Sequence, residues 1–161
     1  MRTLFIALRA LVYMSAFLLL WWWIALRFRV RDSEIGTALP AWTGIIGIAA
    51  MAAGAVLVLL CGGVFVVLGR GTPAIFDAPR KFVAVGPYKY ARNPMYVGAL
   101  MVLSGFALYE HSISMLLLAP LMFLTFHLFV IYYEEPNLRR KFGATYEAYC
   151  KAVPRWIPRG S

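Results

Sequence analysis

Two polar segments stand out in a chain that is otherwise largely apolar. The first covers residues 88–96 (YKYARNPMY), and the second is the pair Glu134-Glu135. Two apolar segments, which break at residues 110–112, lie between them. Two membrane helices joined by so short a loop must run antiparallel, so their outer ends return to the same side of the membrane. We therefore expect four polar residues to lie close together: Asn93, Tyr96, Glu134 and Glu135.

The pair Asn93-Pro94 is typical of a helix start. Asparagine caps exposed backbone N–H groups, and proline fits the first helical position. The same N–H groups and the positive end of the helix dipole can also hold an anion such as a carboxylate. Capping alone is the simpler interpretation, but Tyr88, Tyr96 and Arg92 gather at the same place. Their alternative role is an interfacial aromatic belt.

Glu134 and Glu135 are predicted to end a very apolar helix, where the helix dipole disfavours negative charge. Either neighbouring arginines or a cationic ligand would offset that cost. A ligand with both an amine and a carboxylate would satisfy Glu134 and the helix start together. His127 precedes Glu134 by seven residues and shares its helix face, as a buried polar partner or a substrate contact.

The composition predicts an integral membrane protein. Of the 161 residues, 62% are hydrophobic and 14% are charged, whereas soluble domains are about 45–50% apolar. Four stretches approach the roughly 20 residues that a membrane span needs. They cover residues 4–26, 41–68, 95–109 and 113–133. Glycines in the second and third stretches allow close helix approach, and the whole chain is expected to form one domain.

The lysines and arginines predict the orientation. Most lie at the start of the chain, between the second and third spans, and in the tail, so the positive-inside rule places both termini and the polar cluster in the cytoplasm. We attribute the net charge of +9 to contact with anionic lipids rather than nucleic acid. The two cysteines, Cys61 and Cys150, form no metal-binding motif, so no metal or disulfide is expected.

Residues 69–92 are predicted to form a cytoplasmic connector, because glycines and prolines interrupt them. Pro136 fits the start of a new helix, and an apolar stripe follows it at helical spacing. The stripe consists of Leu138, Phe142, Tyr146, Tyr149 and Val153. The predicted fold is therefore an all-α integral membrane protein with four transmembrane helices, a cytoplasmic connector and a C-terminal interfacial amphipathic helix.

Taken together, these motifs resemble one family of membrane enzymes. The matching text is Gly86-Pro87-Tyr88, residues 92–98 (RNPMYVG), Glu134-Glu135, Leu138, Phe142-Gly143, Tyr146, Tyr149 and Val153-Pro154. In order and spacing it resembles the isoprenylcysteine carboxyl methyltransferase and phospholipid methyltransferase superfamily. The similarity covers about the C-terminal half of the chain.

The resemblance implies S-adenosylmethionine as methyl donor, bound at the cytoplasmic end of the bundle by residues between about 80 and 158. Glu134 would take the donor's amino group. The chain has no glycine-rich nucleotide-binding motif of the soluble type. The residues that the resemblance assigns to the donor are Arg80, Lys81, Phe82, Val83, Tyr88, Asn93, Pro94, Met95, Tyr96 and Glu134.

At two positions the chain departs from the pattern of this family, and both positions bear on the methyl acceptor. Asn93 stands where family members often have histidine, and Val130 stands where the eukaryotic prenylcysteine enzymes have an arginine. The acceptor is therefore left open between a lipid-like or isoprenoid-bearing molecule and phosphatidylethanolamine, and a non-catalytic membrane scaffold is the third alternative. Arg92 and Arg155 are candidates for binding an anionic headgroup. Glu135 or His127 would assist an amine acceptor, which must lose a proton.

Overall fold

The structure is a computed structural model that describes residues 2–35, 39–69 and 83–158. Within these residues every regular element is a helix, and there is no strand. The elements are α1 (Arg2–Arg29), α2 (Asp32–Ile35), α3 (Thr43–Val64), the π-helical η1 (Phe65–Gly69), the 3-10 helix η2 (Gly86–Lys89), α4 (Pro94–Tyr109), α5 (Ile113–Phe129), the π-helical η3 (Val130–Glu134), α6 (Glu135–Phe142) and α7 (Ala144–Ala152). The all-α prediction is confirmed.

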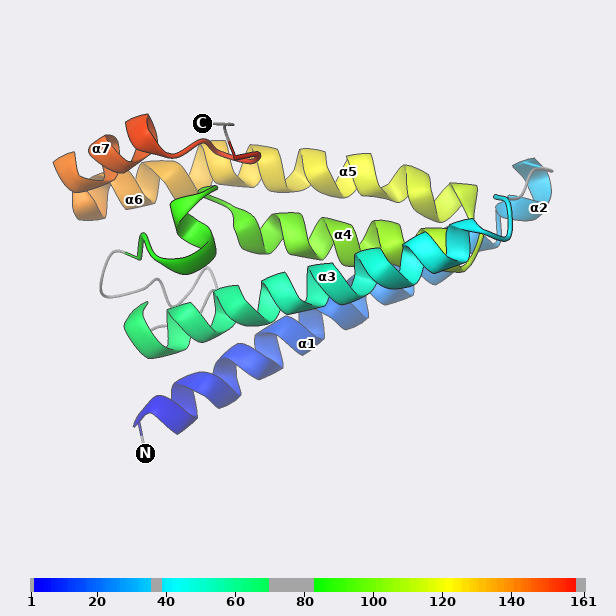
Figure 1. Cartoon of the computed structure of the whole chain (residues 1–161), viewed down its shortest axis with the longest axis horizontal. Coiled ribbons are helices and arrows are strands. Elements are labelled where there is room, and N and C mark those ends of the chain that lie inside the picture. Colours follow the sequence, from blue (N-terminus) through cyan, green and yellow to red (C-terminus); the bar gives the residue numbers. More distant parts are fainter. Residues whose placement is uncertain (1, 36–38, 70–82, 159–161) are drawn as a thin grey trace.

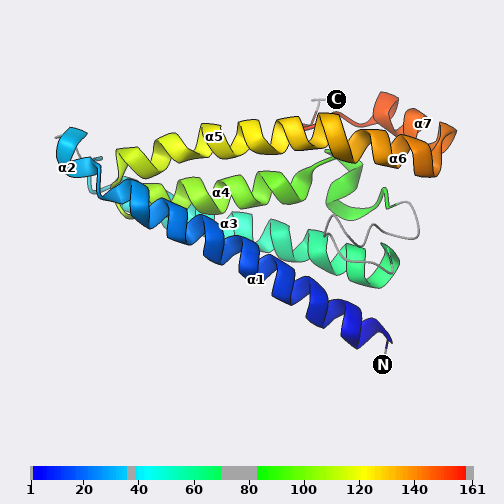
Figure 2. The same cartoon turned by 180° about the vertical axis from the view of Figure 1, so that it is seen from behind.

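Helices α3, α4 and α5 lie side by side, each antiparallel to the next (Figure 1). Helix α1 crosses this layer at an angle, and its first residues diverge from it, as the view from behind shows (Figure 2). One end of the bundle carries η2, α6, α7 and the start of α1, and the other carries α2. The short hairpin between α4 and α5 therefore returns the chain to the end from which α4 started, as the sequence predicts.

Glycines bring α3 and α4 into backbone contact. Gly47 on α3 faces Gly105 on α4, and Gly54 faces Gly98. A Cβ atom added at Gly54 would stand 2.6 Å from the carbonyl oxygen of Gly98, and one added at Gly47 would stand 2.5 Å from that of Gly105. Only glycine fits at such a distance, because any side chain would force the helices apart. The predicted role of these small residues in helix packing is confirmed.

Polar contacts at the α2 end fix the other side of the hairpin. The Ser114 N–H donates to Asp32 over 2.9 Å, and an Arg29 nitrogen lies 2.6 Å from a Glu110 carboxylate oxygen. The first contact joins the start of α5 to the start of α2, and the second joins the end of α1 to the loop after α4. The hairpin is thus held at its closed end, while its open end carries the polar cluster.

Two helical segments are long and apolar enough to cross a membrane, namely Thr43–Val67 and Ile113–Phe142, and α4 is a shorter apolar helix. Only 17% and 33% of their most apolar windows are buried. Soluble proteins rarely expose apolar surface on this scale. The first predicted span falls within the 28-residue α1. Its insertion, and hence the count of four spans, stays a prediction.

The prediction that a helix ends at Glu134-Glu135 is wrong. The chain stays helical from Ile113 to Phe142, through the π-helical turn η3 and past Pro136. Proline donates no backbone hydrogen bond and crowds the carbonyl four residues before it. The wider turn accommodates this, since the N–H of Glu135 bonds to the carbonyl of Val130, five residues back.

The single amphipathic helix predicted after Pro136 is also wrong. Two short helices, α6 and α7, meet at Gly143, whose φ of +51° is a left-handed conformation that favours glycine. The chain reverses there, so that α7 lies beside α6 (Figure 1). Tyr146 and Val153 from the predicted apolar stripe are buried within the protein. The location of α6 and α7 at the membrane surface stays a prediction.

The glycine contacts predict a sharp difference between two identical substitutions in α3. Gly54→Ala places a methyl group against the α4 backbone, so we expect a loss of about 1–3 kcal/mol in stability from overpacking. Gly63→Ala is the matched control, because a Cβ there has no neighbour within 4 Å. Thermal unfolding in detergent should show a lower Tm for Gly54→Ala, with Gly63→Ala at or slightly above the wild-type value. Equal Tm values for the two variants would contradict the packing described.

Candidate active site

The polar groups predicted to converge do so at the open end of the α4–α5 hairpin. The Tyr96 hydroxyl, on the first turn of α4, donates to Glu134 Oε2 over 3.0 Å. The Tyr96 ring also packs against Phe126 of α5, with ring centroids 4.6 Å apart. The start of α4 is thus held by a hydrogen bond to a side chain 38 residues away and by an aromatic contact with α5.

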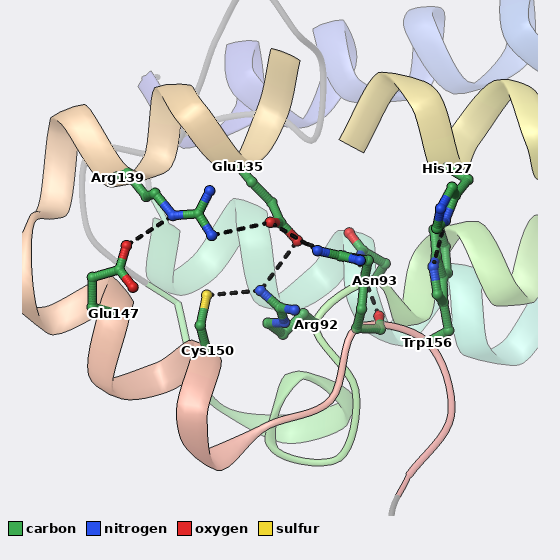
Figure 3. Close-up of polar contacts among 9 residues, drawn as sticks. Arg92, Asn93, His127, Glu135, Arg139, Glu147, Cys150 and Trp156 are labelled. Carbon is green, nitrogen blue, oxygen red and sulfur yellow. Dashed lines mark hydrogen bonds and ion pairs between the residues drawn. The ribbon is translucent and has the colours of Figure 1, made fainter. Parts of the chain in front are cut away.

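The neighbouring glutamate, Glu135, is surrounded by arginines (Figure 3). Its carboxylate lies 3.1 Å from Arg92 Nη1, 2.7 Å from Arg155 Nε and 3.4 Å from Arg139 Nη2. The Glu135 side chain is only 4% exposed. A carboxylate this buried needs such charge partners, because removal from water strongly disfavours its ionised form. The hydrogen bond to Glu135 also raises the pKa of the Arg155 guanidinium.

Asn93 does not cap α4 with its side chain, contrary to prediction. Its Nδ2 group donates instead to the backbone carbonyl of Arg155 over 3.0 Å, and its backbone N–H donates to the same oxygen over 3.2 Å. The adjacent Arg92 N–H donates to the carbonyl of Pro154 over 2.9 Å. The side chain is thus used to bind the C-terminal segment, whereas Pro94 occupies the start of the helix as predicted.

His127 is paired with a residue that sequence reasoning missed. The indole Nε1–H of Trp156 donates to His127 Nδ1 over 3.1 Å (Figure 3). The Trp156 ring also lies 5.1 Å from Phe123 and 6.4 Å from Tyr96, between ring centroids. A lone tryptophan between two prolines carries no helical periodicity, so its contacts could not be read from the sequence. The interpretation of His127 as a polar partner fits this contact.

Tyr88 lies beside the cluster in a small apolar core. It packs with Cys61 and Val83, and Met95 lies against the same group. Burial raises the pKa of the Tyr88 phenol, so its hydroxyl keeps its proton. The Tyr88 carbonyl accepts a 2.6 Å hydrogen bond from Tyr149 of α7. Three further residues were predicted to contact the methyl donor, namely Arg80, Lys81 and Phe82, and they lie outside the described residues.

Arg92 joins several of these groups. Besides Glu135, its Nη1 atom contacts Cys150 Sγ of α7 at 2.7 Å. Both predicted headgroup anchors, Arg92 and Arg155, therefore direct their guanidinium groups at Glu135 in this structure. The described residues contain no cluster of three or more His, Cys, Asp or Glu side chains suited to a metal ion.

An apolar pocket of about 220 Å³ lies deeper in the bundle, among α1, α3, α4 and α5. Ala99 lines it one helical turn from Tyr96, and Met122 lines it one turn from Phe126. The lining thus comes within one helical turn of Tyr96 and Phe126, although neither Tyr96 nor Glu134 lines the pocket itself. Its lining residues are Phe17, Leu18, Trp21, Trp22, Met51, Ala99, Val102, Leu103, Phe106 and Met122.

A comparison with protein-family models matches residues 42–145 to the phospholipid methyltransferase (PEMT) family. This chain belongs to the phospholipid methyltransferase family. The match covers more than half of the chain and includes α3, α4, α5 and both glutamates. The family is part of the integral membrane methyltransferase superfamily that the motifs resemble, so that prediction is confirmed. No curated protein matches the chain.

The different surroundings of Glu134 and Glu135 predict different effects on stability. Glu135→Gln leaves three guanidinium groups around a neutral amide, and breaking a buried ion pair in this way destabilises a protein by about 3–5 kcal/mol. Glu134→Gln keeps an oxygen that accepts from Tyr96. We expect thermal unfolding in detergent to show a large drop in Tm for Glu135→Gln and a small change for Glu134→Gln. The reverse order would contradict the assignment of charge partners.

Proposed function

We propose that this protein is an S-adenosylmethionine-dependent methyltransferase that acts on a lipid-like acceptor at the cytoplasmic face of a membrane. The observation that carries the proposal is which groups surround the Glu134 carboxylate. This carboxylate accepts from Tyr96 but has no cationic partner among the described residues, whereas its neighbour has three. The amino group of the methyl donor would supply the missing positive charge.

The residues around Glu134 fit the rest of such a ligand. Tyr96 and Tyr88 offer aromatic and hydroxyl groups. The first turn of α4 begins with Pro94, which has no N–H, and the backbone N–H groups that follow it, from Met95 onward, are available to a carboxylate. Val83 and Asn93 lie on the flanking segments, and Asn93 keeps its side chain on Arg155. Bound S-adenosylmethionine supplies an electrophilic methyl group on a sulfonium, for direct displacement by a nucleophile of the acceptor.

The chain would contribute by orienting the two reactants and excluding water, which together account for much of the rate in such transfers. The apolar pocket next to Tyr96 suits the hydrocarbon tail of an acceptor whose head lies near Glu134. A carboxylate acceptor needs no base. The exposed lysines on α6 and α7, Lys141 and Lys151, would contact anionic lipid headgroups, consistent with a cytoplasmic location of this end.

The family match favours phosphatidylethanolamine N-methylation as a second candidate reaction. The amine acceptor must then lose a proton, and the two predicted proton acceptors already have partners. Glu135 is engaged by arginines, and His127 Nδ1 accepts from Trp156. A change of partner at His127 would be needed before that nitrogen could take a proton. A non-catalytic scaffold is the remaining alternative.

Equilibrium binding of S-adenosylmethionine to the detergent-purified protein tests the proposal. We expect saturable binding by the wild type and at least about tenfold weaker binding by Glu134→Gln and Tyr96→Ala. The first change removes the negative charge that faces the donor's amino group, and the second removes the aromatic ring and hydroxyl beside it. Gly63→Ala serves as the control. A folded wild type that binds no donor would refute the methyltransferase assignment. Donor binding without methyl transfer to any lipid of a membrane extract would favour the scaffold.

The proposed use of the apolar pocket predicts a separate effect on the acceptor. Ala99→Phe places a ring in the pocket and should raise the KM for the lipid acceptor several-fold, while the affinity for the donor stays near the wild-type value. Ala55→Phe, at an exposed position of α3, adds the same ring outside the pocket. Steady-state kinetics with a radiolabelled methyl donor measures both quantities. If the two variants give the same KM, the acceptor's tail lies elsewhere.

A further inference from the structure

The C-terminal segment 153–157, which we call the strap, lies across the start of α4 (Figure 3). Its backbone accepts from the chain just before α4, where the N–H groups of Arg92 and Asn93 donate to Pro154 and Arg155. Its Trp156 side chain binds His127 of α5. The strap thus connects the segment that leads into α4 and Tyr96 with α5, the helix that leads on to Glu134.

Arg155 makes the central contacts of the strap. Its guanidinium binds Glu135 with two nitrogens, Nε to Oε1 over 2.7 Å and Nη2 to Oε2 over 3.2 Å. Its carbonyl oxygen accepts from both the backbone and the side chain of Asn93. One residue therefore ties the start of α4 to the helix that carries Glu134. A two-point arginine–carboxylate contact fixes orientation as well as distance, which a lysine cannot do.

We propose that Arg155 is a positioning residue for the methyl-donor site, because it sets the start of α4 and Tyr96 against Glu134 without contacting the donor. This inference rests on the proposed function. Tyr96 lies three residues after Asn93, so a shift of Asn93 displaces the tyrosine hydroxyl relative to Glu134. Groups that bind a ligand by several contacts must be held to within about half an ångström, and neighbouring residues of this kind provide that restraint.

The test compares Arg155→Gln, Arg155→Lys and the control Arg140→Gln in the full chain in detergent. Arg140 is an exposed α6 residue whose side chain bonds to Asn137, away from the strap. We expect Arg155→Gln to weaken S-adenosylmethionine binding about tenfold. It should also speed hydrogen exchange of the Arg92 and Asn93 amides in the protein without ligand, since these donate to the strap. Arg155→Lys keeps one contact to Glu135 in place of two, so its donor affinity and its amide exchange rates should lie between those of the wild type and Arg155→Gln. Arg140→Gln should match the wild type in both measurements.

A merely structural role gives a different pattern. A lower Tm for Arg155→Gln with an unchanged donor Kd would overturn the inference, as would unchanged exchange at Arg92 and Asn93. If Arg155→Gln does not fold, the same two measurements on Arg155→Lys decide, with wild-type values refuting the role. A wild type that binds no donor refutes the proposed function and the inference with it. A wild type that binds, with an equally tight Arg155→Gln, refutes the inference alone.

Discussion

The burial of one carboxylate, that of Glu135, constrains the whole candidate site. Its charge is met by Arg139, one turn further along α6 itself, and by arginines from two other parts of the chain: Arg92 before α4 and Arg155 in the strap. An unpaired carboxylate at this depth would be unfavourable by several kcal/mol. These segments must therefore meet when the helix carrying Glu135 packs. The backbone contacts of Arg92 and Asn93 with the strap and the Trp156–His127 hydrogen bond are compatible with this one arrangement.

The adjacent residues Glu134 and Glu135 have different surroundings because they lie on a helix. Successive side chains on a helix point in different directions, so Glu135 turns toward the arginines while Glu134 turns toward Tyr96. The π-helical turn ends at this pair and allows the helix to pass Pro136. Such turns often mark functional sites. The carboxylate of Glu135, paired with arginines, orders the surrounding segments, and the proposed function assigns the carboxylate of Glu134 to a cationic ligand.

The bundle brings these groups to a common end by packing backbone against backbone. Glycine pairs between α3 and α4 remove the side chains that would separate the helices. In lipid this close contact matters, because apolar side chains gain little from leaving a hydrocarbon solvent. The same packing leaves an apolar pocket beside α1, one turn from Tyr96. A polar rim and an apolar interior thus adjoin, as an amphiphilic ligand would require.

The sequence alone determined the helical class, the antiparallel return of the α4–α5 hairpin, the glycine packing and the convergence of Tyr96 with Glu134. These follow from local composition and short spacings, which depend little on distant contacts. It predicted wrongly that a helix ends at Glu134-Glu135, that one helix follows Pro136, and that the Asn93 side chain caps α4. Tertiary structure decided these points, and it alone decided which arginines neutralise Glu135 and where Trp156 packs. Such choices depend on segments up to 62 residues apart, as in the bond from Asn93 to Arg155, and no local pattern records which distant partner a polar side chain will find when it is buried.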